Sequence, residues 1–444
     1  MNKVKFPKEF LWGAATASYQ IEGSPLADGA GPSIWHRFSH TPGNVANGDT
    51  GDVACDHYNR YQEDIRIMKE LNLKAYRFSI SWPRIYPRGK GKINMKGVDF
   101  YSRLVDELLE KDIIPFITLY HWDLPGDLQD LGGWANPDIA GWFSDYADYL
   151  FQVFGDRVKH WITLNEPWVT AAIGHVQGVH APGMKDLYTG FRVVHNQLCA
   201  HSEAVRAFRT RNLNGKIGIT LSNRSQEPAS SDPKDIEAAH IAHEYVNYPL
   251  FLHPIYKGIY PPHLLKVAEE FFPEKYERDL PLIKEPIDFV GINYYSGGLV
   301  RWDPSSPLRI KTERMGLPVT AMDWEIYPKG LYIIFKGVQD GYEPKEVYIT
   351  ENGAAFNDKV EDGKVHDEDR INYLREHFKM AHKAMENGVN LKGYFVWSLL
   401  DNFEWEYGYS KRFGIVYVDY KTQKRIIKDS GYWYRDVILS SEVG

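Results

Sequence analysis

The sequence has little cysteine, no excess of positive charge and no long apolar run. Only Cys55 and Cys199 occur among 444 residues, which excludes a disulfide framework and predicts free thiols in a reducing compartment. The 52 Lys and Arg residues against 59 Asp and Glu residues give a net charge of −7, which disfavours a nucleic acid or an anionic membrane as the main partner. Pro7, Lys8 and Glu9 stand where a signal peptide would be apolar, and no later segment is long and apolar enough for a membrane helix. We therefore expect a cytoplasmic location.

Linker segments are also missing, because no stretch rich in Ser, Gly, Pro or one charge divides the chain. We predict one domain over residues 1–444. The composition is that of a soluble globular protein, with 43% hydrophobic and 25% charged residues. Aromatic residues are plentiful, with 13 Trp, 29 Tyr and 21 Phe. A count alone does not tell whether these rings fill a core or form a binding surface.

Short apolar segments rich in strand-forming residues recur along the chain between longer helical patterns. Their near-continuous apolar character is typical of parallel strands that are covered on both faces. Eight such segments begin near Phe10, Ala75, Ile113, His160, Lys216, Ile287, Glu346 and Leu391. Eight alternations of strand and helix predict an α/β fold of the (β/α)8 barrel type with enlarged loops. The rival is a doubly wound open sheet, but no G-x-G-x-x-G follows the first strand and no Walker loop is present.

Two of the intervening helices have clear apolar faces. Tyr58, Tyr61, Ile65, Met68 and Leu71 recur at helical spacing, and we expect Glu63, Asp64, Arg66 and Lys69 to point away from that face. Before the last strand, Asp367 is a candidate N-cap of a helix that ends near Gly388. Its expected buried residues are Ile371, Leu374, Phe378, Ala381 and Met385.

Polar residues at the carboxyl ends of the predicted strands are the candidate functional groups, because barrel enzymes carry their chemistry there. Two carboxylates stand out: Glu166 closes the fourth segment and Glu351 closes the seventh. The other strand-end residues are Gln20, Arg77, His121, Trp122, Asn165, Asn293, Tyr295, Asn352 and Trp397. These positions include neither a zinc-type set of His or Cys ligands nor several carboxylates at successive strand ends, and no Ser occupies a nucleophile elbow. A pair of Glu residues with amides and indoles around it is what cleavage of a glycosidic bond requires.

Seven motifs spread over the chain give a family resemblance. They are FLWGAATASYQIEG (10–23), YRFSISWPRI (76–85), LYHWDLP (119–125), TLNEPW (163–168), FVGINYY (289–295), YITENGAA (348–355) and WSLLDNFEWEYGYSKRFGIVYVD (397–419). Through them the chain resembles the retaining β-glycosidases of glycoside hydrolase family 1, and most closely their bacterial β-glucosidases. The resemblance implies a (β/α)8 barrel that acts on terminal β-D-glucosyl residues of short β-linked substrates without a cofactor, with galactosides and fucosides as further substrates.

Roles for individual residues follow from this resemblance. Glu166 in TLNEP matches the acid/base of the family, and Glu351 in ITENG matches its nucleophile, with Arg77 and Tyr295 beside the nucleophile. The remaining matches bind the sugar or flank the leaving group. They are Gln20, His121, Asn165, Asn293, Trp397, Glu404 and Trp405 around the sugar, and Trp168 and Trp324 at the leaving group. Five tryptophans, namely Trp122, Trp168, Trp324, Trp397 and Trp405, are thus expected at the mouth of the barrel, and the other eight in packing roles.

The retaining mechanism implies carboxyl groups about 5 to 5.5 Å apart. At that separation the charge of Glu351 is expected to raise the pKa of Glu166 from about 4.3 to a little above 6. Three alternatives stay open. A 6-phospho-β-glycosidase is disfavoured because an anionic Glu404 would repel a phosphate. A thioglucosidase would typically have Gln at the place of Glu166, and a non-catalytic sugar-binding relative should lack one of the two Glu residues.

Overall fold

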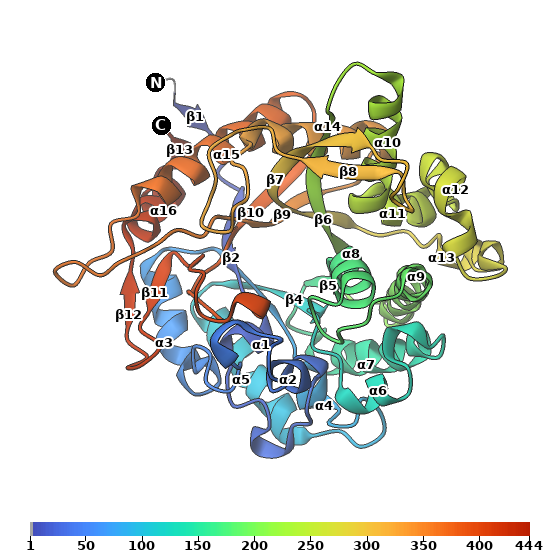
Figure 1. The fold of residues 1–444 in the computed structure, drawn as a ribbon. Coiled ribbons are helices and arrows are strands. Elements are labelled where there is room, and N and C mark those ends of the chain that lie inside the picture. The colour runs from blue at the N-terminus through green and yellow to red at the C-terminus, as the bar shows by residue number, and fades with distance from the viewer. Residues whose placement is uncertain (1–2) are drawn as a thin grey trace.

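The fold is a closed barrel of eight parallel strands surrounded by helices (Figure 1). The computed structural model describes residues 3–444. Each strand pairs in parallel with the next, and β6 also pairs with β7, which closes the ring. The strands are β2 (Leu11–Ala15), β3 (Ala75–Ser79), β4 (Ile114–Tyr120), β5 (His160–Asn165), β6 (Lys216–Pro228), β7 (Phe289–Trp302), β9 (Val347–Asn352) and β10 (Leu391–Trp397). All eight segments expected from the sequence are confirmed, and so is the (β/α)8 class.

Long helices between the strands form the outer ring (Figure 1). They are α3 (His57–Glu70), α5 (Met95–Glu110), α7 (Ile139–Phe154), α9 (Leu187–Thr210), α10 (Pro233–Val246), α14 (Pro328–Tyr342), α15 (Glu368–Glu386) and α16 (Asp429–Ser440). The short strand β8 (Ile310–Glu313) extends the sheet beside β7 in antiparallel orientation. The two ends of the chain meet, because β1 (Val4–Lys5) pairs with β13 (Glu442–Val443).

Two expectations about helix side chains are wrong. Asp64 of α3 is fully buried rather than turned to solvent, because it forms an ion pair with Arg425 and a hydrogen bond with His57. Asp367 stands at the N-cap position of α15 but makes no capping hydrogen bond. Its carboxylate instead accepts hydrogen bonds from the backbone and side chain of Ser430 and pairs with Arg370. In both cases a residue far away in the sequence, Arg425 for Asp64 and Ser430 for Asp367, supplies contacts that no local pattern reveals.

Aromatic rings fill the interior of the barrel. Phe116 of β4 contacts Phe395 of β10 and Tyr348 of β9, with ring centroids 4.8 and 5.5 Å apart. Neither β9 nor β10 is a neighbour of β4 in the sheet, so these rings meet across the inside. Packed side chains therefore close the floor beneath the carboxyl ends of the strands.

Trp12 belongs to a second aromatic group, which lies between the barrel and the outer helices. Its ring packs against Phe6, Phe10, Phe378 of α15 and Tyr434 of α16 at centroid distances of 4.7 to 5.8 Å. We expect Trp12→Phe to lower the free energy of unfolding by about 1–3 kcal/mol, because the smaller ring leaves a cavity. The rate constant kcat/KM should stay unchanged.

Chemical denaturation beside steady-state kinetics checks this expectation. The half-buried Trp142 provides the matched control, because Trp142→Phe removes less buried surface. Loss of kcat/KM without loss of stability in Trp12→Phe would contradict the packing role.

Both cysteines are free, with Cys55 buried and Cys199 partly buried, as the sequence predicts. Among residues 3–444, no helix combines the length and the apolar composition that crossing a bilayer requires.

Candidate active site

The two candidate carboxyl groups face one cavity at the carboxyl end of the barrel. Glu166 directly follows β5 and stands at the N-cap of the short helix α8 (Pro167–Ala171), while Glu351 lies near the end of β9. Both side chains are buried, and both line a cavity of about 630 Å³. That volume is typical of a site for a small molecule.

Arg77 and Tyr295 hold Glu351. Nη1 of Arg77 donates to Oε1 of Glu351 at 2.6 Å, and the hydroxyl of Tyr295 donates to Oε2 at 2.7 Å. Each carboxylate oxygen therefore has its own donor, and one donor is a cation. The pKa of Glu351 is raised overall, because burial is the largest cause, but Arg77 and the Tyr295 hydroxyl act in the opposite direction and lower it. The contacts therefore favour an ionised Glu351.

Glu166 has a different environment. Its direct partner is the neutral amide of Asn293, whose Nδ2 donates to Oε1 of Glu166 at 2.8 Å. The hydroxyl of Thr350 donates to Oδ1 of Asn293 at 2.7 Å, which fixes the amide so that the NH2 group faces Glu166. Burial, and after it the charge of Glu351, raises the pKa of Glu166 to about 8. The single proton that the pair shares near neutral pH therefore resides on Glu166.

This result corrects the expectation for Glu166 in size and in cause. From the sequence, the charge of Glu351 alone predicts that the pKa of Glu166 rises to a little above 6. In the folded protein burial is the larger cause, and the charge of Glu351 comes second. Burial depends on the packed loops around the site, so a calculation from strand ends alone omits it.

The amide of Asn165 determines which nitrogen of His121 is protonated. Oδ1 of Asn165 accepts hydrogen bonds from Arg77 and Asn293, at 2.6 and 3.1 Å, so its NH2 group must face the other way. There Nδ2 donates to Nε2 of His121 at 3.0 Å. Burial, together with the charge of Arg77, holds the pKa of His121 well below its usual value. The neutral ring therefore carries its proton on Nδ1, a buried donor that has no partner among residues 3–444.

Gln20 and Glu404 lie together. Nε2 of Gln20 donates to Asn402, to the carbonyl of Phe403 and to Oε2 of Glu404, at 3.0, 2.9 and 3.3 Å. Oε1 of Gln20 is buried and has no hydrogen-bond partner within the described chain. Burial raises the pKa of Glu404 well above its usual value, and Glu406 and Glu351 add to that effect. Burial and the neighbouring acidic groups thus disfavour the anionic Glu404 that the sequence argument assumes.

Tryptophan side chains form much of the cavity wall. All five tryptophans expected at the barrel mouth line it. Trp405 packs against Trp122 and against Trp35 behind it, with ring centroids 4.6 and 4.5 Å apart. Trp324 lies near Tyr295, at 5.4 Å. Flat apolar faces with N–H groups at their edges suit the C–H faces and hydroxyls of a sugar ring.

The remaining sequence candidates divide into two groups. His121, Tyr295 and Glu404 line the cavity, together with the two Glu residues and the tryptophans. Gln20, Arg77, Asn165 and Asn293 are fully buried and hydrogen-bond to residues that line it. The second group therefore also orients the first.

The sequence argument missed several cavity residues. Asn223 and Arg224 come from β6, the fifth barrel strand, for which no site residue was expected. The strand-end rule would have found them, because they follow the apolar part of that segment. His180 and Glu406 lie at the same cavity and pair with each other at 2.7 Å. They come from loops far apart in the sequence, so no local signal joins them.

Two carboxyl groups that hold one proton between them, beside indole faces and buried amides, suit the cleavage of the acetal that links two sugars. The fold and the site together define the class of the protein as a glycoside hydrolase. Comparison with known proteins supports this class and identifies the family within it.

The chain belongs to glycosyl hydrolase family 1, whose sequence profile matches residues 2–443. It is 66% identical over 438 residues to a 1,4-β-D-glucan glucohydrolase of Thermotoga neapolitana, covering 98% of this chain and 99% of that one. It is 64% identical over 442 residues to β-glucosidase A of Thermotoga maritima, covering 99% of each chain. A solved structure of a family 1 β-glucosidase from T. maritima superimposes with a TM-score of 0.98 over the whole of both chains at 63% identity. The family resemblance seen in the motifs is thereby confirmed.

Proposed function

We propose that this protein is a retaining β-glucosidase, in which Glu351 is the nucleophile and Glu166 the acid/base. The observation that carries the assignment is the contrast between the two carboxyl groups. Glu351 is bound by a guanidinium and a phenol, whereas Glu166 is buried against a neutral amide. The first environment favours an anion and the second a neutral acid, which are the two states that the first step requires. The barrel with its loops, residues 1–444, would act as one domain.

The reaction proceeds in two displacements. Glu166 donates its proton to the glycosidic oxygen while a carboxylate oxygen of Glu351 bonds to C1 of the sugar, and the C1–oxygen bond to the leaving group breaks. The negative charge of Glu351 is one of the causes of the high pKa of Glu166. Esterification removes that charge, so the pKa of Glu166 falls. Glu166 thus becomes a stronger acid, and its carboxylate then takes a proton from the water that attacks C1. The ester bond between C1 and Glu351 breaks in this step, which releases the sugar and restores the Glu351 carboxylate and the Glu166 acid. The product sugar has the configuration of the substrate.

Hydroxyl recognition would use buried polar atoms that lack partners among residues 3–444. Of these, Nδ1–H of His121 is a donor and Oε1 of Gln20 an acceptor. Glu404, which also lines the cavity, would contribute its carboxyl oxygens. The indoles of Trp397 and Trp405 would contact the sugar ring, with Trp168 and Trp324 at the leaving group.

The pH dependence of kcat/KM follows from these protonation states. We expect activity to fall as the pH rises through about 8, because Glu166 then loses the proton that it must donate. Activity should also fall at low pH, where Glu351 becomes protonated and can no longer attack C1. Initial rates on 4-nitrophenyl β-D-glucoside at low substrate concentration, from about pH 4 to 10, measure both limbs. A profile that stays flat above pH 9 would contradict the role of Glu166.

A 6-phospho-β-glycosidase is the second candidate within the fold. Glu404 and Glu406 both line the cavity, and their acidic side chains would face a substrate phosphate. Kinetics on nitrophenyl β-glucoside, β-galactoside and β-fucoside, on cellobiose and lactose, and on 6-phosphorylated counterparts compare the candidates directly. We expect the plain glucoside to have the highest kcat/KM. A higher value on the phosphorylated glucoside would overturn the proposal.

Two further measurements complete the test. Proton NMR of the first-formed glucose should show the β-anomer, and an initial α-anomer would exclude a retaining mechanism. No turnover of any glycoside, with sugar binding intact, would identify a non-catalytic relative.

A further inference from the structure

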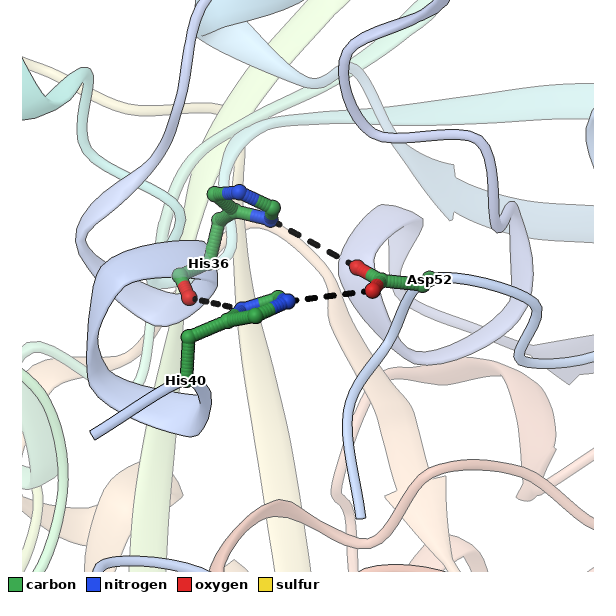
Figure 2. Close-up of side chains that lie close together, drawn as sticks. All are labelled: His36, His40 and Asp52. Carbon is green, nitrogen blue, oxygen red and sulfur yellow. Dashed lines mark hydrogen bonds and ion pairs between the residues drawn. The ribbon is translucent and has the colours of Figure 1, made fainter. Parts of the chain in front are cut away.

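Three potential metal ligands meet outside the active site (Figure 2). His36 and His40 lie four residues apart, on helix α2 (Ile34–Ser39) and at its C-cap, so both rings project from one face. Asp52 comes from the loop that precedes α3. Oδ1 of Asp52 lies 3.6 Å from Nδ1 of His36, and Oδ2 lies 3.0 Å from Nε2 of His40. One ligand atom from each of the three residues lies within 4.8 Å of the other two.

The hydrogen bonds of His40 leave its Nε2 without a proton when the ring is neutral. Nδ1 of His40 lies 2.7 Å from the backbone carbonyl of His36, and a carbonyl oxygen accepts only, so Nδ1 must carry the proton. In a neutral ring Nε2 then presents a lone pair to the carboxylate of Asp52. A histidine bound in this way to a backbone carbonyl is the usual arrangement of a metal ligand, because the hydrogen bond orients the ring.

The surroundings of His36 favour a bound metal ion over a protonated His40 as the group that faces Asp52. Its Nδ1 is buried, has no hydrogen-bond partner among residues 3–444, and is too far from Asp52 for a hydrogen bond. A proton added to Nε2 of His40 would allow a hydrogen bond to Asp52, but it would leave Nδ1 of His36 without a partner among residues 3–444. A cation between the three side chains would satisfy both rings. Zinc–ligand distances of about 2.0–2.2 Å place tetrahedral neighbours about 3.4 Å apart, between the two observed separations.

We propose that His36, His40 and Asp52 form a binding site for a divalent transition metal, of which Zn²⁺ is the probe. Two imidazoles and a carboxylate suit first-row divalent ions rather than Mg²⁺ or Ca²⁺. The side chains of His40 and Asp52 are 42% and 44% exposed, so the ion has access and water completes its coordination.

The site joins two segments that support the sugar-binding wall. Trp35, beside His36, packs on Trp405 of that wall. On the other side of the site, Asp49 and Thr50 precede Asp52 and hold Tyr409: the Tyr409 backbone N–H donates to Oδ2 of Asp49, and its hydroxyl donates to the carbonyl of Thr50. A metal ion would therefore connect α2 to the loop that anchors the segment after Trp405. Its role is to stabilise this wall, without contact to the reacting atoms.

A second group of potential ligands consists of His195, Cys199 and Asp279. Here both ring nitrogens of His195 already have partners, since Nδ1 lies 2.9 Å from the hydroxyl of Tyr260 and Nε2 lies 3.0 Å from Oδ2 of Asp279. This group has no unpartnered ring nitrogen, so it carries no proposal. It serves instead as a control, because a thiolate ligand is spectroscopically distinct.

The test measures Zn²⁺ binding to the full-length protein after treatment with EDTA, by isothermal titration calorimetry. His40→Ala and Asp52→Asn remove one ligand each at exposed positions. His366→Ala is the matched control, because His366 forms an exposed pair with Asp429 that lacks a third ligand within the described chain. Cys199→Ser tests the second group. Basal activity on 4-nitrophenyl β-D-glucoside without metal shows that each variant is folded.

We expect one Zn²⁺ per chain and a higher midpoint of thermal unfolding when zinc is bound. His40→Ala and Asp52→Asn should weaken binding more than about 100-fold, since even an outer-shell partner typically contributes about 10–100-fold. His366→Ala and Cys199→Ser should bind like the parent protein. Co²⁺ should give visible d–d bands without thiolate charge transfer.

Absence of saturable binding would overturn the proposal. Equal weakening in His366→Ala would show adventitious binding to surface histidines. Loss of binding in Cys199→Ser, or a thiolate band with Co²⁺, would place the metal at the second group instead.

Discussion

Replacement of Glu351 by alanine should lower kcat on every glycoside by about 10⁵-fold or more, because it removes the carboxylate that bonds to C1 in the first displacement. Arg77 and Tyr295 would keep their positions but would have no carboxylate to orient. Steady-state kinetics on 4-nitrophenyl β-D-glucoside and on cellobiose measure the loss. Glu406→Gln is the matched control, because Glu406 also lines the cavity but pairs with His180. Its loss of activity should be far smaller.

The nucleophile assignment has two further consequences. A 2-deoxy-2-fluoro glucoside with a good leaving group should form a stable ester on Glu351, which mass spectrometry of the digested protein locates. Azide should partly restore turnover in Glu351→Ala and form the α-glucosyl azide, because the small anion enters the space of the lost carboxylate and attacks the same face of C1. An ester on another residue, or a β-azide, would contradict the assignment.

Replacement of Glu166 by alanine should have an effect that depends on the leaving group. Cellobiose needs a proton on its departing oxygen, so we expect a loss of about 10²–10⁴-fold in kcat/KM. A dinitrophenol departs without a proton, and for its glucoside kcat/KM should fall much less. With this substrate the intermediate should accumulate, because no base remains to activate water, and a burst of phenol would reveal it.

The pH profile distinguishes catalysis from a merely structural effect of Glu166. In Glu166→Gln the amide keeps the size of the side chain and has no proton to lose, so the fall in kcat/KM above about pH 8 should disappear with the activated substrate. Asn293→Ala is a useful companion, because it leaves Glu166 in place but removes the amide that orients it. Equal losses on activated and unactivated glucosides in Glu166→Ala would refute the acid/base role.

The surroundings of Glu404 bear on how the site would reject phosphorylated substrates. The sequence suggested that a charged Glu404 repels a phosphate. Burial and neighbouring acids raise the pKa of Glu404, which disfavours that charge. Discrimination would then come from the same surroundings: a phosphate dianion beside Glu404 would face the acidic groups, Glu406 and Glu351, that raise the pKa of Glu404.

Local sequence patterns are sufficient to predict the barrel strands and the position of the active site. Each strand is a buried apolar segment between helices, and a parallel barrel gathers all carboxyl strand ends at one mouth. The position of Glu166 after β5 and of Glu351 in β9 therefore sufficed to bring both to one cavity. Polar residues on helices were less predictable. Asp64 and Asp367 depart from the local rules for exposure and capping, because Arg425 and Ser430, far away in the sequence, determine what they contact.

The fold class, the family and the two glutamates at the barrel mouth are readable from the chain, because periodicity and motif identity are properties of neighbouring residues. The pKa shifts of Glu166, His121 and Glu404 are not, because burial and hydrogen-bond direction arise from segments that meet in space. The cluster of His36, His40 and Asp52 likewise depends on the tertiary structure. Helical spacing places the two histidines on one face, but a folded loop brings the third ligand.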